Sequence, residues 1–196
     1  MSMIVQVTGI PSDQFPECPL AIPVFVDQRP PRREAGRVNF RLQGMLTKWL
    51  EQGEIDSGSP TPTLYSPGAG NPFPLLVVAG AGNFDELSAP AIERIIASMT
   101  ETFLRAQVPL FGLAARDFKR PLTPARDSAE IVLRGLAHGA DMAEVKEGRV
   151  IRVHWEPAEL ELMVQEMRRF RHKITSARDW QIEPATEDRQ WREAGP

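Results

Sequence analysis

The stretch LLVVAGAGNFDEL, residues 75–87, decides which fold the sequence predicts. It begins with an apolar run that includes two adjacent valines, a pattern typical of a buried β-strand. Gly80 and Gly82 then permit a tight corner, because glycine adopts backbone conformations that other residues avoid. Ser88, directly after the stretch, is a favourable N-cap for a helix. The stretch therefore predicts a strand that leads through a glycine corner into a helix.

The segments that follow this corner complete a strand–helix–strand unit. Apolar residues recur at helical spacing over 90–106, and the apolar segment 108–114 comes next. Two strands joined by a helix in this way normally run parallel. Further strands are expected at 3–8, 20–27, 63–66 and 149–155, and further helices at 36–53, from Thr123 or Asp127 to 140, and at 157–174. The sequence thus predicts an α/β fold with a parallel sheet.

Length and composition indicate a single folded core. The chain has 196 residues, of which 42% are hydrophobic and 25% charged. This is enough for one substantial core and short for two domains. We expect an α/β domain over 1–156, a C-terminal helix over 157–174 and an extended polar tail over 175–196.

Charge and cysteine content exclude several classes of partner. The formal net charge of -3 gives no general attraction to nucleic acid or to an anionic membrane surface. Cys18 is the only cysteine, so no disulfide can form within the chain, and the sequence fits a reducing compartment. No apolar window is long enough to span a membrane, and the N-terminus lacks the pattern of a signal peptide. We therefore expect a soluble cytoplasmic protein that binds neither nucleic acid nor membrane.

The glycine corner is the first candidate ligand site. A dinucleotide fingerprint requires a third glycine where this sequence has Asp85, and the lysine and hydroxyl of a P-loop do not follow. What remains is the corner Gly80, Ala81, Gly82 and Asn83 at the end of a predicted parallel strand. Sheets of this type bind ligands at that edge, where free backbone N–H groups can hold an anion. The alternative is a structural turn, which the nearby acidic side chains favour.

A basic patch is the second candidate site. It consists of Arg29, Arg32, Arg33, Arg37 and Arg41, opposed only by Glu34. Guanidinium groups can bind phosphate or carboxylate through paired hydrogen bonds. The alternative is a solvated face, or ion pairs with an acidic neighbouring subunit, because no aromatic side chains interleave to stack bases.

Catalytic chemistry has no support in the sequence. His138, His154 and His172 lack metal-binding spacing. No serine lies in a nucleophile motif, and Cys18 has no local histidine partner. We expect no catalytic residue, no metal and no cofactor, and therefore no enzyme.

Several segments, taken in order, resemble the N-terminal domain of leucyl aminopeptidases, the M17 peptidase family. They are VFVDQRPPRREAGRVNFRLQGMLTKWLEQGEIDSG (24–58), the glycine corner, VPLFGLAARDF (108–118) and IVLRGLAHGAD (131–141). The strand that ends at Asp27, the helix after it and the glycine corner match the family in kind and order. The resemblance covers about residues 3–155 and extends to the Arg-Asp stretch at Arg178.

This resemblance implies a three-layer, macro-domain-like α/β fold with a mixed, mostly parallel sheet flanked by helices. In that family the N-terminal domain supports oligomer assembly, and the two-metal peptidase site belongs to a second domain that has no counterpart in this sequence. The resemblance thus implies a non-catalytic, stand-alone assembly or interaction module that forms a homo-oligomer.

Two alternatives remain at the level of the sequence. One is a macro-like module that binds a nucleotide or an ADP-ribose derivative, with Asp27 in the place of the adenine-contacting aspartate of macro domains. Its second phosphate loop would lie near Gly112, although FGLAARDF (111–118) is poor in glycine. The other is a regulatory subunit of a separately encoded aminopeptidase catalytic domain, which the charged tail would dock as a protein partner.

Overall fold

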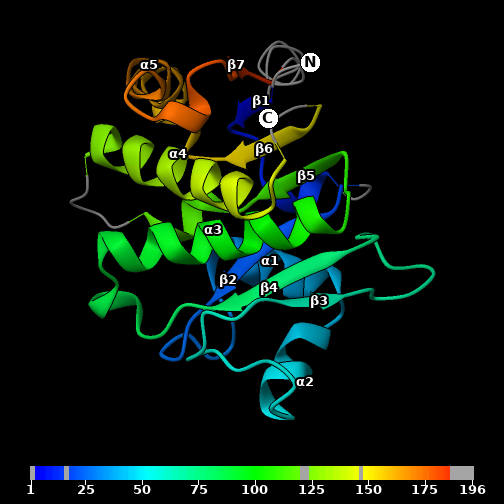
Figure 1. Ribbon diagram of the computed structural model, residues 1–196. Coiled ribbons are helices and arrows are strands. Elements are labelled where there is room, and N and C mark those ends of the chain that lie inside the picture. Colours follow the sequence, from blue (N-terminus) through cyan, green and yellow to red (C-terminus); the bar gives the residue numbers. More distant parts are fainter. Residues whose placement is uncertain (1–2, 16–17, 120–123, 146–147, 186–196) are drawn as a thin grey trace.

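The computed structural model describes residues 3–15, 18–119, 124–145 and 148–185. Its centre is one seven-stranded sheet with helices on both faces (Figure 1). The strands are β1 (Ile4–Thr8), β2 (Leu20–Val24), β3 (Thr63–Tyr65), β4 (Leu76–Gly80), β5 (Leu110–Leu113), β6 (Val150–His154) and β7 (Gln181–Pro184). Their order is β3-β4-β2-β5-β6-β1-β7; β3 runs antiparallel to β4, and the other neighbours are parallel. The expected three-layer α/β fold with a mixed, mostly parallel sheet is confirmed.

Strands β2 and β4 are neighbours in the sheet, and each is apolar on both faces. Every residue of both strands is buried, as in parallel sheets covered on two sides. The register pairs Val24 with Gly80, so both strands end at the same edge of the sheet. The glycine corner therefore begins beside the end of β2.

The helices cover the sheet unequally. They are α1 (Arg33–Arg41), α2 (Met45–Glu51), α3 (Ala89–Arg105), α4 (Ala125–Met142) and α5 (Leu160–Arg171). Apolar residues of α3, α4 and α5 pack in one core with β1 and β6, and those of α1 and α2 form a second core against β2 and β4. The predicted unit of strand, helix and strand is present as β4, α3 and β5, with β2 between the two strands.

Helices α3 and α4 pack closely because α4 carries two glycines on the contact face. A Cβ atom at Gly135 would lie 2.7 Å from Cβ of Ile96, and one at Gly139 would lie 2.5 Å from the carbonyl oxygen of Ala97. Neither separation is compatible with a side chain, so glycine sets the distance between the helices.

The prediction of one continuous helix over 36–53 is wrong. The chain forms α1 and α2 with a break between them, where Gln43 has φ 54° and Gly44 has φ 82°. Left-handed backbone cannot continue a right-handed helix. Across the break, Asn39 Oδ1 accepts from Thr47 N at 3.0 Å, and Asn39 Nδ2 donates to Thr47 Oγ1 at 2.9 Å.

The C-terminal segment differs from the expected extended tail. Residues 181–184 form β7, which pairs in parallel with β1 through a register that includes Val5 and Ile182. Trp180 is buried just before this strand. Arg168 Nε on α5 donates to the carbonyl oxygen of Ile182 at 2.7 Å, which ties the strand to the helix. The rest of the expected tail, 186–196, lies outside the described residues.

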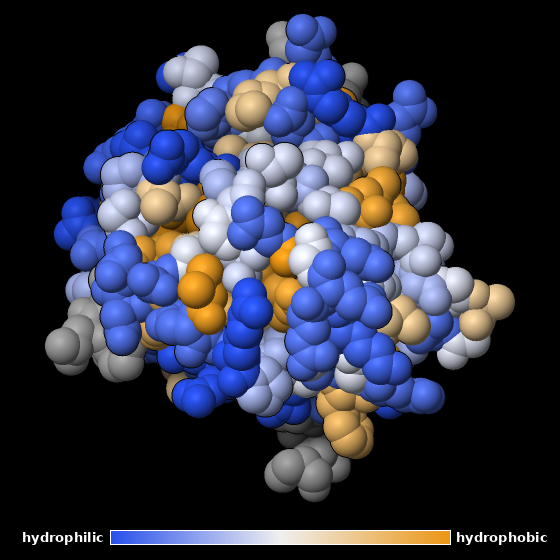
Figure 2. All heavy atoms as spheres, turned by 90° about the horizontal axis from the view of Figure 1, so that it is seen from below, coloured by the Kyte–Doolittle hydropathy of each residue, from blue (hydrophilic) through white to orange (hydrophobic). Residues whose placement is uncertain are grey.

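Hydrophobic side chains reach the surface in separate places. In the face drawn in Figure 2, orange atoms form small groups among hydrophilic ones. The large hydrophobic side chains that are exposed in the described part of the chain are Val26, Phe40, Leu64, Met142 and Leu162. Within the described ranges no helix is both long and apolar enough to cross a membrane. The expected homo-oligomer stays a prediction.

Candidate functional site

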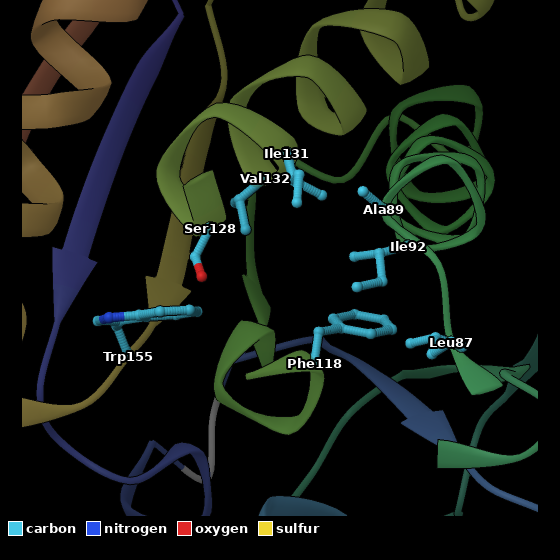
Figure 3. A pocket seen from close by; sticks show the side chains of 8 residues that line it. All are labelled: Leu87, Ala89, Ile92, Phe118, Ser128, Ile131, Val132 and Trp155. Atoms are coloured by element: carbon cyan, nitrogen blue, oxygen red, sulfur yellow. The ribbon is translucent and has the colours of Figure 1, made fainter. Parts of the chain in front are cut away.

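A pocket opens at the carboxyl edge of the sheet, between the first turns of α3 and α4 (Figure 3). It is lined by Leu87, Ala89, Ile92, Phe118, Ser128, Ile131, Val132 and Trp155. Its volume is about 130 Å³. An engineered apolar cavity of roughly 150 Å³ holds benzene, so this pocket has room for about one aromatic ring.

Connections at the ends of parallel strands bring the lining residues together. Trp155 directly follows β6, and Phe118 ends the short helical turn η3 (Ala115–Phe118) after β5. Leu87 precedes α3, while Ser128 lies in the first turns of α4. In α/β sheets this edge is where ligands bind, because the loops there are free to vary while the strands hold them in place.

The side chains that the structure describes in the pocket lining are apolar or aromatic, except for the hydroxyl group of Ser128. Trp155 and Phe118 lie along one side, and side chains of α4 lie on the other, with the hydroxyl of Ser128 directed into the pocket (Figure 3). The indole Nε1 of Trp155 donates to Glu159 Oε2 at 3.3 Å. The ring of Trp155 is therefore held in place, and its N–H group already has an acceptor.

Asp117, the residue before Phe118, links η3 to α1, which packs on the other face of the sheet from α3 and α4. Oδ1 and Oδ2 of Asp117 accept from the backbone N–H groups of Glu34 and Ala35, each at 3.0 Å. These groups belong to the first turn of α1, whose N-cap Arg32 provides no side-chain cap. Burial raises the pKa of Asp117 to about 7, although the two N–H donors act against this shift.

Cationic side chains beside the pocket are paired with carboxylates. Arg116 Nε lies 2.6 Å from Glu156 Oε1, and its Nη1 lies 3.6 Å from Glu34 Oε1. Lys119 Nζ lies 2.7 Å from Glu159 Oε1. Both pairs are partly buried, so their positive charge is largely balanced within the protein.

The glycine corner lies next to the pocket and is tightly held. N–H of Ala81 donates to the carbonyl oxygen of Val24 at 2.8 Å, and N–H of Gly82 donates to that of Ser57 at 2.9 Å. A Cβ atom at Gly80 would lie 2.2 Å from the carbonyl oxygen of Asp56, so this glycine allows a close backbone approach. The side chain of Asn83 donates to Glu86 Oε2 at 3.0 Å. The anion role of the corner stays a prediction, with two of its donors already engaged.

Asp27 lies against the turn that follows the glycine corner. Both carboxylate oxygens of Asp27 accept from N–H of Phe84, at 3.1 and 3.2 Å. Phe84 begins the turn η2 (Phe84–Glu86) that follows the corner. In this conformation Asp27 ties the end of β2 to that turn, and its expected contact with an adenine stays untested.

The arginines of the basic patch point to different partners. Arg29 donates to Ser57 Oγ at 3.2 Å, and Arg37 lies 3.8 Å from both Asp13 and Glu34. The guanidinium of Arg33 lies 4.4 Å from the centre of the Phe84 ring, and its Nη1 donates to the carbonyl oxygen of Lys119 at 2.9 Å. Arg32 and Arg41 are exposed. The five do not converge on one site in the described structure, and the anion role of the patch stays a prediction.

A buried histidine lies on the opposite face of the sheet from Trp155. His154 Nδ1 lies 2.9 Å from the carbonyl oxygen of Ile10, and burial lowers the pKa of His154 to about 4. A Cβ atom at Gly112 would lie 2.9 Å from His154 Nε2, so Gly112 makes room for the ring within β5. The second phosphate loop expected near Gly112 stays a prediction. No group of His, Cys, Asp and Glu side chains suited to a metal occurs in the part of the chain that the structure describes.

Sequence reasoning missed the residues that line the pocket. Phe118 and Trp155 are far apart in the sequence. Local pattern predicts only a loop at Phe118 and the end of a strand at Trp155. Their place in the sequence could have indicated the site, because both lie at the ends of predicted parallel strands, at the edge where ligands bind.

Solved structures identify the fold. A macrodomain mutant of Oceanobacillus iheyensis aligns with a TM-score of 0.66 at 11% identity, over 86% of this chain and 93% of that one. The chain has the macrodomain fold. A second mutant of that macrodomain, solved with ADPR, gives 0.63 at 9% identity over 84% and 91% of the two chains, and the macrodomain of Thermus aquaticus DarG gives 0.55 at 12% over 78% and 98%. No family model and no curated protein matches the sequence.

The macrodomain fold corrects the family expected from the sequence. The resemblance to the N-terminal domain of leucyl aminopeptidases is wrong, because the structures that match are macrodomains in their own right. The resemblance was based on short motifs, and only the macro-domain-like α/β fold that it implied is confirmed. The assembly role that followed from the aminopeptidase resemblance loses its basis with it.

Proposed function

We propose that this macrodomain-fold chain is a ligand-binding domain whose pocket holds the ring of a nucleotide-type ligand, with ADP-ribose derivatives as the first class to test. The observation that carries the proposal is the preformed pocket in which Trp155 and Phe118 lie beside the hydroxyl of Ser128. Small-molecule sites commonly combine apolar and aromatic walls with a few polar groups. The place of the pocket, at the carboxyl ends of parallel strands, supports the same role.

The fold gives the proposal a ligand class. One of the macrodomain structures similar to this chain was solved with ADPR, and another with ADP. Both molecules carry an adenine, a flat ring that suits aromatic walls. The lining residues that the structure describes include no acid, histidine, cysteine or lysine, which supports binding as the role to test first.

Filling the pocket tests this proposal. Ala89 is exposed and lines the pocket in the first turn of α3, so Ala89→Trp places a bulky ring at its entrance. ADP-ribose is expected to raise the melting temperature of the wild type with increasing concentration, as linkage requires, and to leave Ala89→Trp unchanged.

The matched control is Ala106→Trp. Ala106 is also exposed, but it caps the opposite end of α3, roughly 25 Å away at 1.5 Å per residue. This variant is expected to respond to ADP-ribose like the wild type. Equal responses of wild type and Ala89→Trp would show that the ligand does not use the pocket.

A further inference from the structure

We infer that the pocket binds the uncharged nucleoside part of its ligand and makes no stabilising contact with a diphosphate. A purine nucleoside should therefore bind about as well as its diphosphate-containing derivatives. This inference rests on the proposed function, because it names which part of the ligand the same pocket recognises. It is carried by the way in which acidic side chains pair with the α1 N-terminus, Arg116 and Lys119, the positive groups that the structure describes beside Phe118.

The first of these groups is the N-terminus of α1. The free N–H groups of a helix start, with its dipole, are where proteins commonly hold phosphate. Here the carboxylate of Asp117 accepts from the N–H groups of Glu34 and Ala35 and is itself 1% exposed. The carboxyl group of Asp117 therefore occupies the N–H groups that a phosphate would use.

The second group is the set of cations that flank Asp117 and Phe118. Arg116 is paired with Glu156 and Glu34, and Lys119 is paired with Glu159. A phosphate that approached either cation would have to displace a carboxylate held at 2.6 or 2.7 Å. These charge-assisted contacts are strong, and the loss of one would leave an acidic group beside the phosphate.

Arg33 is engaged in a different way. Its guanidinium stacks on the ring of Phe84 and donates to the carbonyl oxygen of Lys119. The contact joins the start of α1 to the segments on both sides of the pocket. One Nη1–H group of Arg33 and one face of its guanidinium are therefore already in contact with the protein.

The lining of the pocket selects against charge as well. Of its eight residues, seven are apolar or aromatic, and the N–H group of Trp155 already donates to Glu159. Burying an ionised group without a partner carries a large desolvation cost. A flat, neutral heterocycle with one hydrogen-bonding edge fits both the room for about one ring and the hydroxyl of Ser128.

Titration calorimetry with adenosine and with ADP-ribose tests the inference on the wild-type chain. We expect the two dissociation constants to agree within about threefold. Salt weakens contacts between charged groups, and the pocket makes none with the phosphates. The affinity for ADP-ribose should therefore change less than about twofold between roughly 0.05 and 0.5 M salt. ADP-ribose binding more than about 30-fold tighter than adenosine, with a marked loss in high salt, would overturn the inference and leave the proposed function standing. If neither ligand binds, the proposed function is itself wrong.

A variant separates the blocked helix start from the rest of the site. Asp117→Ala frees the N–H groups of Glu34 and Ala35, so ADP-ribose should gain about tenfold or more over adenosine. Circular dichroism shows whether the variant is folded. A folded Asp117→Ala protein with an unchanged ratio of affinities would contradict the role given to Asp117, and the wild-type titration decides the inference even if the variant does not fold.

Discussion

Asp117 and Phe118 are adjacent in one helical turn and serve opposite faces of the sheet: the carboxylate of Asp117 caps α1, while the ring of Phe118 lines the pocket beside α3 and α4. The cap and the pocket are therefore joined by a single peptide bond. A substitution that shifts the cap of α1 should therefore also shift the ring of Phe118 in the pocket, because both side chains belong to η3.

The pH dependence of stability should report the buried carboxyl of Asp117. Burial raises the pKa of Asp117 to about 7 in the folded chain, from an ordinary value of 3.8. Between these values the folded state holds a proton that the unfolded state has lost, so this group makes the protein less stable as pH rises from about 4 to 7, by up to roughly 1.4 kcal/mol per pH unit. Asp117→Asn should remove this contribution, as measured by urea unfolding at several pH values.

His154 opposes this effect over part of the range. Its pKa is lowered to about 4 from 6.5, so the unfolded state binds a proton that the folded state excludes, and stability falls as pH drops from 6.5 towards 4. In the wild type the two contributions should largely cancel there. In Asp117→Asn the histidine contribution should emerge as a clear rise of stability with pH, and a flat profile in that variant would refute the assignment.

Ser128 should contribute to ligand affinity through one hydrogen bond. Ser128→Ala removes the hydroxyl group found among the described lining residues and creates little extra space. A loss of about 1 kcal/mol, or roughly fivefold in the dissociation constant, is expected for a neutral bond. Calorimetry with adenosine measures it, and Ser98→Ala on the far part of α3 serves as the control that should bind normally.

The close packing of α3 and α4 should not tolerate a methyl group. At an exposed helical position, replacing glycine by alanine usually stabilises by about 1 kcal/mol. At Gly135 the new Cβ would collide with Ile96, so Gly135→Ala should instead destabilise by about 1–3 kcal/mol. Denaturant unfolding gives the sign directly. His138→Ala, on the exposed side of the same helix, should stay within about 0.5 kcal/mol of the wild type.

The break between α1 and α2 offers a pair of substitutions with opposite signs. Gly44 has φ 82°, so Gly44→Ala should cost about 1 kcal/mol. Gln43 has φ 54° with a side chain present, so Gln43→Gly should relieve strain there, and the gain should exceed the entropy that glycine adds to the unfolded chain. Thermal melting of both variants tests the pair, and two shifts in the same direction would contradict this account of the break.

The elements that sequence reasoning predicted correctly are those in which local pattern and burial agree. Strand β4 and helix α3 have apolar residues at the spacing of their own secondary structure, so no distant partner is needed to recognise them. The break at Gln43 was missed because its left-handed backbone interrupts a run of apolar residues that keeps helical spacing. Strand β7 was missed because its sequence QIEP is polar and ends in proline, and only pairing with β1 makes it a strand.

The candidate site was predicted in part. The edge of the sheet was found, because a glycine corner after a buried strand marks where α/β folds bind ligands. The pocket itself was not, since it needs Phe118, Ser128 and Trp155 from three segments that meet only in the folded chain. Asp117 was missed for the same reason, because its role depends on N–H groups of a helix more than 80 residues away in the sequence.

The two glycines on α4 also determine how a ligand would be received. With Gly135 against Ile96 and Gly139 against the backbone of α3, the two helices cannot approach further and would lose close contacts by separating. We therefore expect the two helices that form part of the pocket wall to keep their separation when a ligand binds. Selection would then act by shape at entry, and amide hydrogen exchange along α3 and α4 would be nearly as slow in the empty protein as in the filled one.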